Sequence, residues 1–191
     1  MRKTMNGFTI VELVVVIVVI GVLATISIVA YNGIQQRSRT SQTINAATQW
    51  VKGLMIYKAK NGGLPNTNSC LGAGYKYNSD GAGASGTGQC FQNGASGTTV
   101  SSAFSTTMSS YMTGLPSPAM VSAVNSPTVW WRGIIYNIAA GNTAQIIFVL
   151  DKGQACPAKL AEYALGSTTT ATDSDIVCTY SIGSTVSYDF S

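Results

Sequence analysis

The chain begins with a nearly uninterrupted apolar run. From Phe8 to Tyr31 there are 24 residues, and the only ionisable side chain among them is that of Glu12. An α-helix of this length extends about 36 Å at about 1.5 Å per residue, enough to cross a hydrocarbon core about 30 Å thick. A β-strand of the same residues would be nearly 80 Å long, at about 3.3 Å per residue, and strands of that length are not found. The run therefore predicts a membrane-spanning helix over residues 8–31.

A secretory signal peptide is the competing interpretation of the same run. Arg2 and Lys3 precede it, as basic residues precede the apolar core of a signal peptide. That core is usually about 7 to 15 residues long, and no small-residue cleavage site of the A-x-A kind follows this longer run. We therefore favour an anchor that is retained in the protein.

Beyond the apolar run the pattern becomes that of an amphipathic helix. Apolar residues recur at spacings of three and four between polar ones, at Ile44, Ala47, Val51 and Leu54. Asn61 and Gly62 form a helix stop signal, and Pro65 follows shortly after. These signals predict that the helix continues over residues 32–61 and that its apolar stripe packs against a sheet.

Four later segments have the composition of β-strands, namely 128–140, 143–151, 175–182 and 185–190. Gly141 and Asn142 separate the first two segments and predict an antiparallel hairpin. Trp130 and Trp131 are adjacent, so one should be buried and the other should face outward. We expect an α+β fold in which the long N-terminal helix packs on an antiparallel sheet of about four strands. Residues 66–128 are rich in Gly, Ser and Thr and are expected to be mostly loop.

Composition argues against an enzyme. The chain contains no His, which excludes His-based catalytic triads and His-ligated metals. The Gly-rich segment 79–90 has neither GKS nor GKT and no GxGxxG, so nucleotide binding is disfavoured. The formal net charge of +4 gives no argument for nucleic-acid binding, which stays open. We expect no enzymatic activity and no cofactor.

The cysteines indicate where the C-terminal part resides. All four lie beyond residue 69, and disulfides persist outside the cytoplasm. Four cysteines allow three pairings. Pairing of sequence neighbours is favoured, which gives Cys70 with Cys90 and Cys156 with Cys178. A zinc site is the alternative, but the spacing is not CxxC and no His is available, so no metal is expected.

The segment "GFTIVEL", residues 7–13, resembles the processing site of type IV prepilins and related pseudopilins. The resemblance implies that residues 1–7 are a leader peptide and that a membrane peptidase cuts between Gly7 and Phe8. It also implies that the same enzyme N-methylates the amine of Phe8. The family has a long N-terminal helix and a globular head, here residues 62–191. The loop between Cys156 and Cys178 is similar to the C-terminal disulfide loop of these subunits.

Glu12 has a particular role in this resemblance. Cleavage after Gly7 creates an amine on Phe8, four residues before Glu12 and therefore on the same helix face. In the family's filaments the Glu of an incoming subunit meets the N-terminal amine of its neighbour, which implies an assembly role for Glu12. A carboxylate that only reaches toward the membrane surface is the alternative. The helix has Gly21 but Val29 where many filament-forming members have Pro, so the resemblance does not extend to the unwinding of this stretch on assembly.

The resemblance implies a structural subunit of an extracellular filament. Expected partners are identical or related pilin subunits, the prepilin peptidase and methyltransferase, the pilus assembly machinery and the inner membrane. The protein would cross the inner membrane once before assembly and lie in a surface or periplasmic filament afterwards. A pseudopilin of a type II secretion or competence DNA-uptake system is the first alternative, and a single-pass anchored extracellular binding protein is the second. Adhesion, motility, DNA uptake and secretion are not distinguished.

Overall fold

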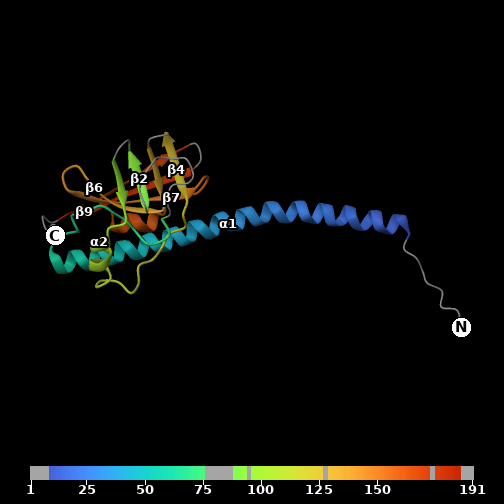
Figure 1. Ribbon diagram of the computed structural model, residues 1–191. Helices are drawn as coiled ribbons and strands as arrows, with labels where there is room; N and C mark the ends of the chain where they lie inside the picture. Colours follow the sequence, from blue (N-terminus) through green and yellow to red (C-terminus); the bar gives the residue numbers. More distant parts are fainter. Residues whose placement is uncertain (1–8, 76–87, 94–95, 127–128, 173–174, 186–191) are drawn as a thin grey trace. The chain divides into compact units, whose positions relative to one another are not determined.

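A computed structural model describes residues 9–75, 88–93, 96–126, 129–172 and 175–185 of the chain (Figure 1). The chain divides into two compact units, residues 1–38 and residues 39–191. Helix α1 (Ile10–Asn61, 52 residues) contributes to both units. The unit formed by residues 39–191 is called the head from here on; it includes the second half of α1 in addition to residues 62–191, the head expected from the sequence.

Helix α1 ends where the sequence predicts. Its last residue is Asn61, and Gly62 adopts a left-handed conformation with φ of +80°. The Gly62 amide still donates a hydrogen bond to the Lys58 carbonyl oxygen at 2.9 Å, and the Asn61 side chain donates to the Tyr57 carbonyl oxygen. A glycine at this position ends the helix without steric cost. The predicted Asn-Gly stop is confirmed.

The head contains two antiparallel sheets. The five-stranded sheet has the order β1-β6-β7-β9-β8, formed by β1 (Ser69–Cys70), β6 (Ile134–Ala139), β7 (Thr143–Asp151), β9 (Asp175–Ser184) and β8 (Gly166–Ala171). The four-stranded sheet has the order β3-β2-β5-β4, formed by β3 (Ser96–Thr99), β2 (Gln89–Asn93), β5 (Val129–Arg132) and β4 (Ser122–Ser126). Helix α2 (Ser102–Met108) and the 3-10 helix η1 (Ala158–Tyr163) complete the described elements (Figure 1).

The main core lies between α1 and the five-stranded sheet. The helix buries the face formed by Ala46, Ala47, Trp50, Val51, Leu54 and Tyr57. These side chains form one cluster with residues of β6, β7, β9 and α2, among them Phe104, Tyr136 and Phe148. The Trp50 indole also donates a hydrogen bond to the Pro116 carbonyl oxygen at 2.8 Å. Each large apolar side chain buried in this way stabilises the head by about 1.5–3 kcal/mol.

The fold class predicted from the sequence is confirmed, and most of the predicted stripe is buried. Ala47, Val51 and Leu54 are each at most 1% exposed, while Ile44 is half-buried at the edge of the core. The two adjacent tryptophans also differ in exposure, as predicted. Trp130 is 2% exposed and Trp131 is half-buried. The predicted hairpin is formed by β6 and β7, which pair antiparallel across residues 140–142.

Residues 66–128 contain β1, β2, β3, α2 and β4, which the sequence did not indicate, although slightly more than half of the described residues in this range lie outside these elements, as predicted. One prediction about the sheets is wrong. The single strand predicted over residues 128–140 is divided at Gly133, so that β5 and β6 belong to different sheets. Gly133 has φ of +62°, and a Cβ there would lie 2.7 Å from the Tyr75 hydroxyl oxygen. The strand predicted over residues 185–190 falls outside the described residues except for Thr185, which forms a single bridge with Leu64.

Two disulfides connect the parts of the head. Cys70 in β1 is bonded to Cys90 in β2, which joins the five-stranded sheet to the four-stranded sheet. Cys156, in the segment before η1, is bonded to Cys178 in β9. Cys70, Cys90 and Cys178 are buried. The first disulfide therefore joins the four-stranded sheet to the five-stranded sheet that packs on α1.

Two tyrosines, the half-buried Tyr75 and the fully buried Tyr136, make the head sensitive to alkaline pH. Burial raises the pKa of Tyr75, and burial together with the nearby Tyr57 hydroxyl raises the pKa of Tyr136. The Tyr136 hydroxyl donates to the Pro65 carbonyl oxygen at 2.6 Å, and the Tyr75 hydroxyl accepts from the Ile134 amide at 3.0 Å. Both folded-state pKa values exceed the unfolded value, so their contribution is complete below about pH 10 and is lost above it.

We therefore expect the head to unfold as pH rises above about 10, with each tyrosine destabilising by about 1.4 kcal/mol per pH unit. Circular dichroism and tyrosine absorbance, recorded together on the full chain in detergent, measure this transition. Replacing the half-buried Tyr163 by Phe is the matched control and should leave the midpoint in place. Ionisation of all tyrosines near pH 10 with the head still folded would contradict the prediction.

Candidate membrane and assembly site

The first turn of α1 is closed by a reciprocal pair of hydrogen bonds. The Glu12 carboxylate accepts from the Thr9 amide at 2.9 Å and from the Thr9 hydroxyl at 2.8 Å. In return the Glu12 amide donates to the Thr9 hydroxyl oxygen at 3.3 Å. This is a capping box, in which a Thr before the helix and a Glu three residues later satisfy each other's amides. The arrangement fixes where the carboxylate points.

Thr9 is a residue that the sequence analysis did not single out. The signal was present, because Thr, two intervening residues and Glu ahead of an apolar run is the sequence pattern of a capping box. The Glu12 carboxylate also lies at the positive end of the helix dipole, where a negative charge is favourable. Glu12 therefore has a local structural role in addition to any role between subunits.

The first turns of α1 present apolar side chains on all sides. Every large hydrophobic residue from Ile10 to Ile28 is at least 46% exposed. The two hydroxyl residues in this stretch are satisfied within the helix, because Thr25 donates to the Val22 carbonyl oxygen and Ser27 donates to the Leu23 carbonyl oxygen. Within the described residues, α1 is the helix that is long and apolar enough to cross a membrane. Such a helix needs lipid or other apolar helices around it.

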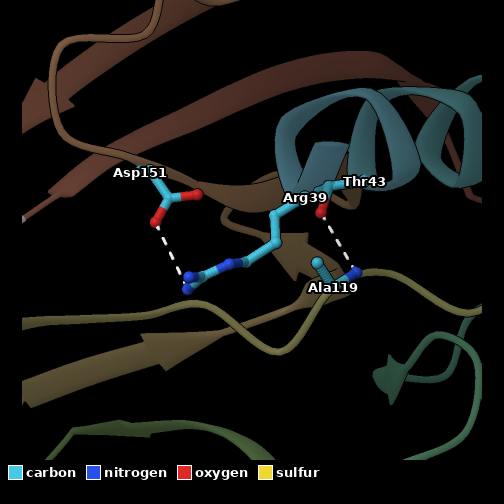
Figure 2. Close-up of polar contacts among 4 residues, drawn as sticks. All are labelled: Arg39, Thr43, Ala119 and Asp151. Atoms are coloured by element: carbon cyan, nitrogen blue, oxygen red, sulfur yellow. Dashed lines mark hydrogen bonds and ion pairs between the residues drawn. The ribbon is translucent and has the colours of Figure 1, made fainter. Parts of the chain in front are cut away.

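Polar contacts fix α1 in the head where the amphipathic part begins. Figure 2 shows Arg39 and Thr43 of α1 facing Asp151, the last residue of β7, and Ala119. The Arg39 guanidinium lies 3.7 Å from the Asp151 carboxylate, whose side chain is only 12% exposed. The Ala119 amide donates to the Thr43 hydroxyl oxygen at 3.2 Å. These contacts join residues distant in sequence, and nothing in the sequence pattern indicated them.

The predicted site residues fall into three groups. Gly7 and Phe8, the predicted cleavage and methylation positions, lie outside the described residues. Glu12 lies in the first turn of the exposed apolar part of α1. The four cysteines lie in the head, away from the sequence of the processing site, and form the two disulfides described above. The structure therefore places one candidate assembly residue at the start of a helix suited to apolar surroundings.

Comparison with protein families finds the prokaryotic N-terminal methylation motif over residues 2–28. Among curated proteins, the fimbrial protein EcpC of Eikenella corrodens is 33% identical over 72 residues, which are 38% of this chain and 47% of that protein. A fimbrial protein of Neisseria meningitidis is 31% identical over 38% of this chain and 42% of its own length. The type IV major pilin protein PilE1 of Neisseria gonorrhoeae is 31% identical over 38% of this chain and 44% of its own length.

The chain thus matches less than half the length of each of these relatives. No solved structure matches the chain significantly. A long N-terminal helix packed on antiparallel sheets, behind a methylation motif, defines a type IV pilin-like protein. The chain carries the N-terminal motif of type IV prepilins and is distantly similar to type IV pilins and fimbrial proteins. The resemblance identified from the sequence is confirmed.

Proposed function

We propose that this protein is a structural subunit of an extracellular filament, made as a membrane-anchored precursor. The observation that carries the proposal is the methylation motif over residues 2–28, followed by a capped helix with an exposed apolar surface. Relatives named as fimbrial proteins and as a major pilin support it. The two disulfides support a head on the extracytoplasmic side, because disulfides persist there.

In this proposal the exposed apolar stretch of α1 holds the assembled filament together. In the membrane its side chains are surrounded by lipid, which lets a pool of subunits wait before use. In a filament the same side chains bury against the helices of neighbouring copies. Burial of a Val, Leu or Ile side chain from water contributes about 1.5–3 kcal/mol, so a bundle of such helices stays together outside the membrane. The heads then form the filament surface.

Glu12 determines how the helices register in this proposal. Cleavage after Gly7 leaves an amine on Phe8, one helical turn before the carboxylate. A carboxylate within an apolar bundle costs at least about 2.5 kcal/mol unless it meets a cation, so the Glu12 carboxylate pairs with a Phe8 amine when subunits pack. Thr9 positions the carboxylate through its two hydrogen bonds. Only a stagger that brings one subunit's amine to the next subunit's carboxylate satisfies both charges.

Processing is the first step that can be tested. The mature protein should begin at Phe8 with a methylated amine, and Gly7→Val should leave the intact leader in place. Mass spectrometry of the N-terminal peptide measures both, on sheared surface filaments for the wild type and on membrane fractions for Gly7→Val. Gly33→Val is the matched control, because a Cβ at Gly33 meets nothing within 4 Å and the residue lies outside the motif.

Assembled material that still begins at Met1, or a cut beyond residue 30, would contradict the proposed processing. Mature protein that occurs only in membrane fractions, and never in sheared filaments, would favour the pseudopilin alternative over a surface pilin. The two results can be read separately, because cleavage is measured on membrane protein before assembly and filament formation is measured afterwards. The experiment therefore separates the maturation of the subunit from the kind of filament it forms.

A further inference from the structure

Strand β8 forms an uncharged edge of the five-stranded sheet. All six of its residues, Gly166–Ala171, are exposed, and β9 pairs with only one side of the strand. The pairing runs from Gly166 opposite Ser181 to Ala171 opposite Ile176 without a register shift. Leu165 continues the strand through a hydrogen bond to the Ser181 carbonyl oxygen and is 81% exposed. Alternate residues of such an edge present unpaired amide and carbonyl groups outward.

The other sheet edges in the described part of the head are protected. Strand β1 has only two residues, and β3 has four, one of them glycine. Strand β4 has a register shift between Val124 and Ser126 and is followed in sequence by a proline. Short length, bulges, proline and charged residues are the usual means by which proteins prevent edge pairing. Strand β8 uses none of them, because residues 163–172 contain no charge and no proline.

The chemistry of the β8 edge specifies its occupant. The edge requires an extended strand, since only a strand supplies alternating amides and carbonyls at the right spacing. Its sequence, Ser167 followed by Thr168, Thr169 and Thr170, is complementary to itself in antiparallel pairing. Threonines opposite threonines pack their methyl groups and exchange hydroxyl hydrogen bonds, and no like charges are opposed within the strand.

We propose that β8 is a two-fold contact through which two copies of this protein pair head to head. Antiparallel pairing about a centre near Thr168 and Thr169 extends each five-stranded sheet into a continuous sheet across both molecules. It also brings the exposed Leu165 of one copy opposite the Ala171 end of the other. The same patch serves both partners, which makes the contact self-complementary and closed.

Such a contact joins subunits of two different filaments. Neighbours within a helical filament are related by a screw operation, which generates head-to-tail contacts and not two-fold ones. Lateral pairing of filaments is therefore the role of the β8 contact, and this role rests on the proposed filament function. The pairing of two heads through β8 does not depend on assembly and can be measured in unassembled protein.

Cysteine substitutions along β8 test the contact. Both native disulfides use all four cysteines of the chain, so an introduced cysteine is its single free thiol. Thr168→Cys and Thr169→Cys should give disulfide-linked dimers of the full chain under mild oxidation, in detergent and in filaments. Val124→Cys is the matched control, because Val124 is an exposed residue of another edge strand. We expect about tenfold more dimer from the better β8 position, since only facing cysteines meet the disulfide distance limits.

A second pair of variants tests the contact without an added thiol. Thr169→Lys places two like charges across the two-fold axis and should abolish bundling of filaments, whereas Val124→Lys should not. Preserved native disulfides in each variant show that the head has folded. The proposal would be overturned if Thr168→Cys and Thr169→Cys gave no more dimer than Val124→Cys. It would also be overturned if the introduced β8 thiol formed its disulfide with another protein or with a different part of a second copy.

The experiments distinguish a failure of the proposed β8 contact from a failure of the proposed filament function. Glu12→Val combined with Thr169→Cys should remove filaments and retain the dimer in detergent. Loss of the β8 dimer with normal filaments would overturn only the two-fold contact. Absence of filaments from the wild-type protein, with the dimer present, would overturn only the filament function.

Discussion

Glu12→Val should leave membrane insertion and cleavage after Gly7 intact and should abolish filament formation. Valine makes the precursor more stable in lipid, because a carboxylate in an apolar segment costs at least about 2.5 kcal/mol. The same change removes the partner of the Phe8 amine in the filament. A loss of about 3 kcal/mol at each contact weakens assembly about a hundredfold per subunit. Electron microscopy of cells lacking the wild-type copy, with immunoblots of membrane fractions, measures the effect.

The capping box requires a control that separates local from intersubunit roles. Glu12→Gln keeps a side chain that can complete a capping box but has no charge. Thr9→Val removes the hydroxyl that bonds Glu12 and should cost the helix end about 1 kcal/mol. We expect Glu12→Gln to fail in assembly and Thr9→Val to reduce it only partly. Wild-type filament numbers from Glu12→Gln would show that the carboxylate is only a helix cap.

Removal of the Cys70–Cys90 disulfide should strongly destabilise the head. The bond closes a sequence separation of 20 residues, for which the chain-entropy model gives about 3 kcal/mol. That loss should lower the melting temperature of the head by about 6–12 °C. Thermal unfolding of full-length protein carrying Cys70→Ala and Cys90→Ala, compared with the wild type in the same detergent, measures it.

The second disulfide provides the comparison. The double substitution Cys156→Ala and Cys178→Ala removes a disulfide that closes a similar separation of 22 residues. The loss of stability in the chain-entropy model should therefore be nearly equal for the two disulfides. Only the first pair should loosen one sheet from the other, which limited proteolysis would detect as earlier cleavage near β2 and β3. Equal proteolysis of the two variants would show that the four-stranded sheet holds without its covalent link. Peptide mapping without reduction checks the connectivity.

Much of the fold could be predicted because its signals are local. The apolar run, the Asn61 and Gly62 stop and the strands around Phe148 and Cys178 each follow from a pattern within a few residues. The four-stranded sheet could not be predicted in the same way. Its β2 and β3 consist mainly of Gln, Asn, Ser, Gly and Thr, and they are held by pairing with β5 and by a disulfide. Their stability comes from distant residues and not from their own hydrophobic alternation.

In the candidate site, too, local sequence signals could be predicted and contacts between distant residues could not. Glu12 was found because it is a charge in an apolar run within a specific motif, and Thr9 could have been found by its spacing from Glu12. The pair of Arg39 and Asp151 could not have been found. The two residues come from α1 and β7, and their approach depends on how the whole head packs.

The position of β9 determines when the head can fold. Strand β9 lies between β7 and β8 and pairs with both, yet it is the last strand of the described chain. The bridge between Leu64 and Thr185 likewise joins the end of the helical part to the end of β9. Synthesis therefore releases the residues of α1 and of the eight other described strands before the strand that unites the five-stranded sheet is available. Folding of the head is completed only after residues 175–185 are available, and chains that stop earlier expose open sheet edges on β7 and β8.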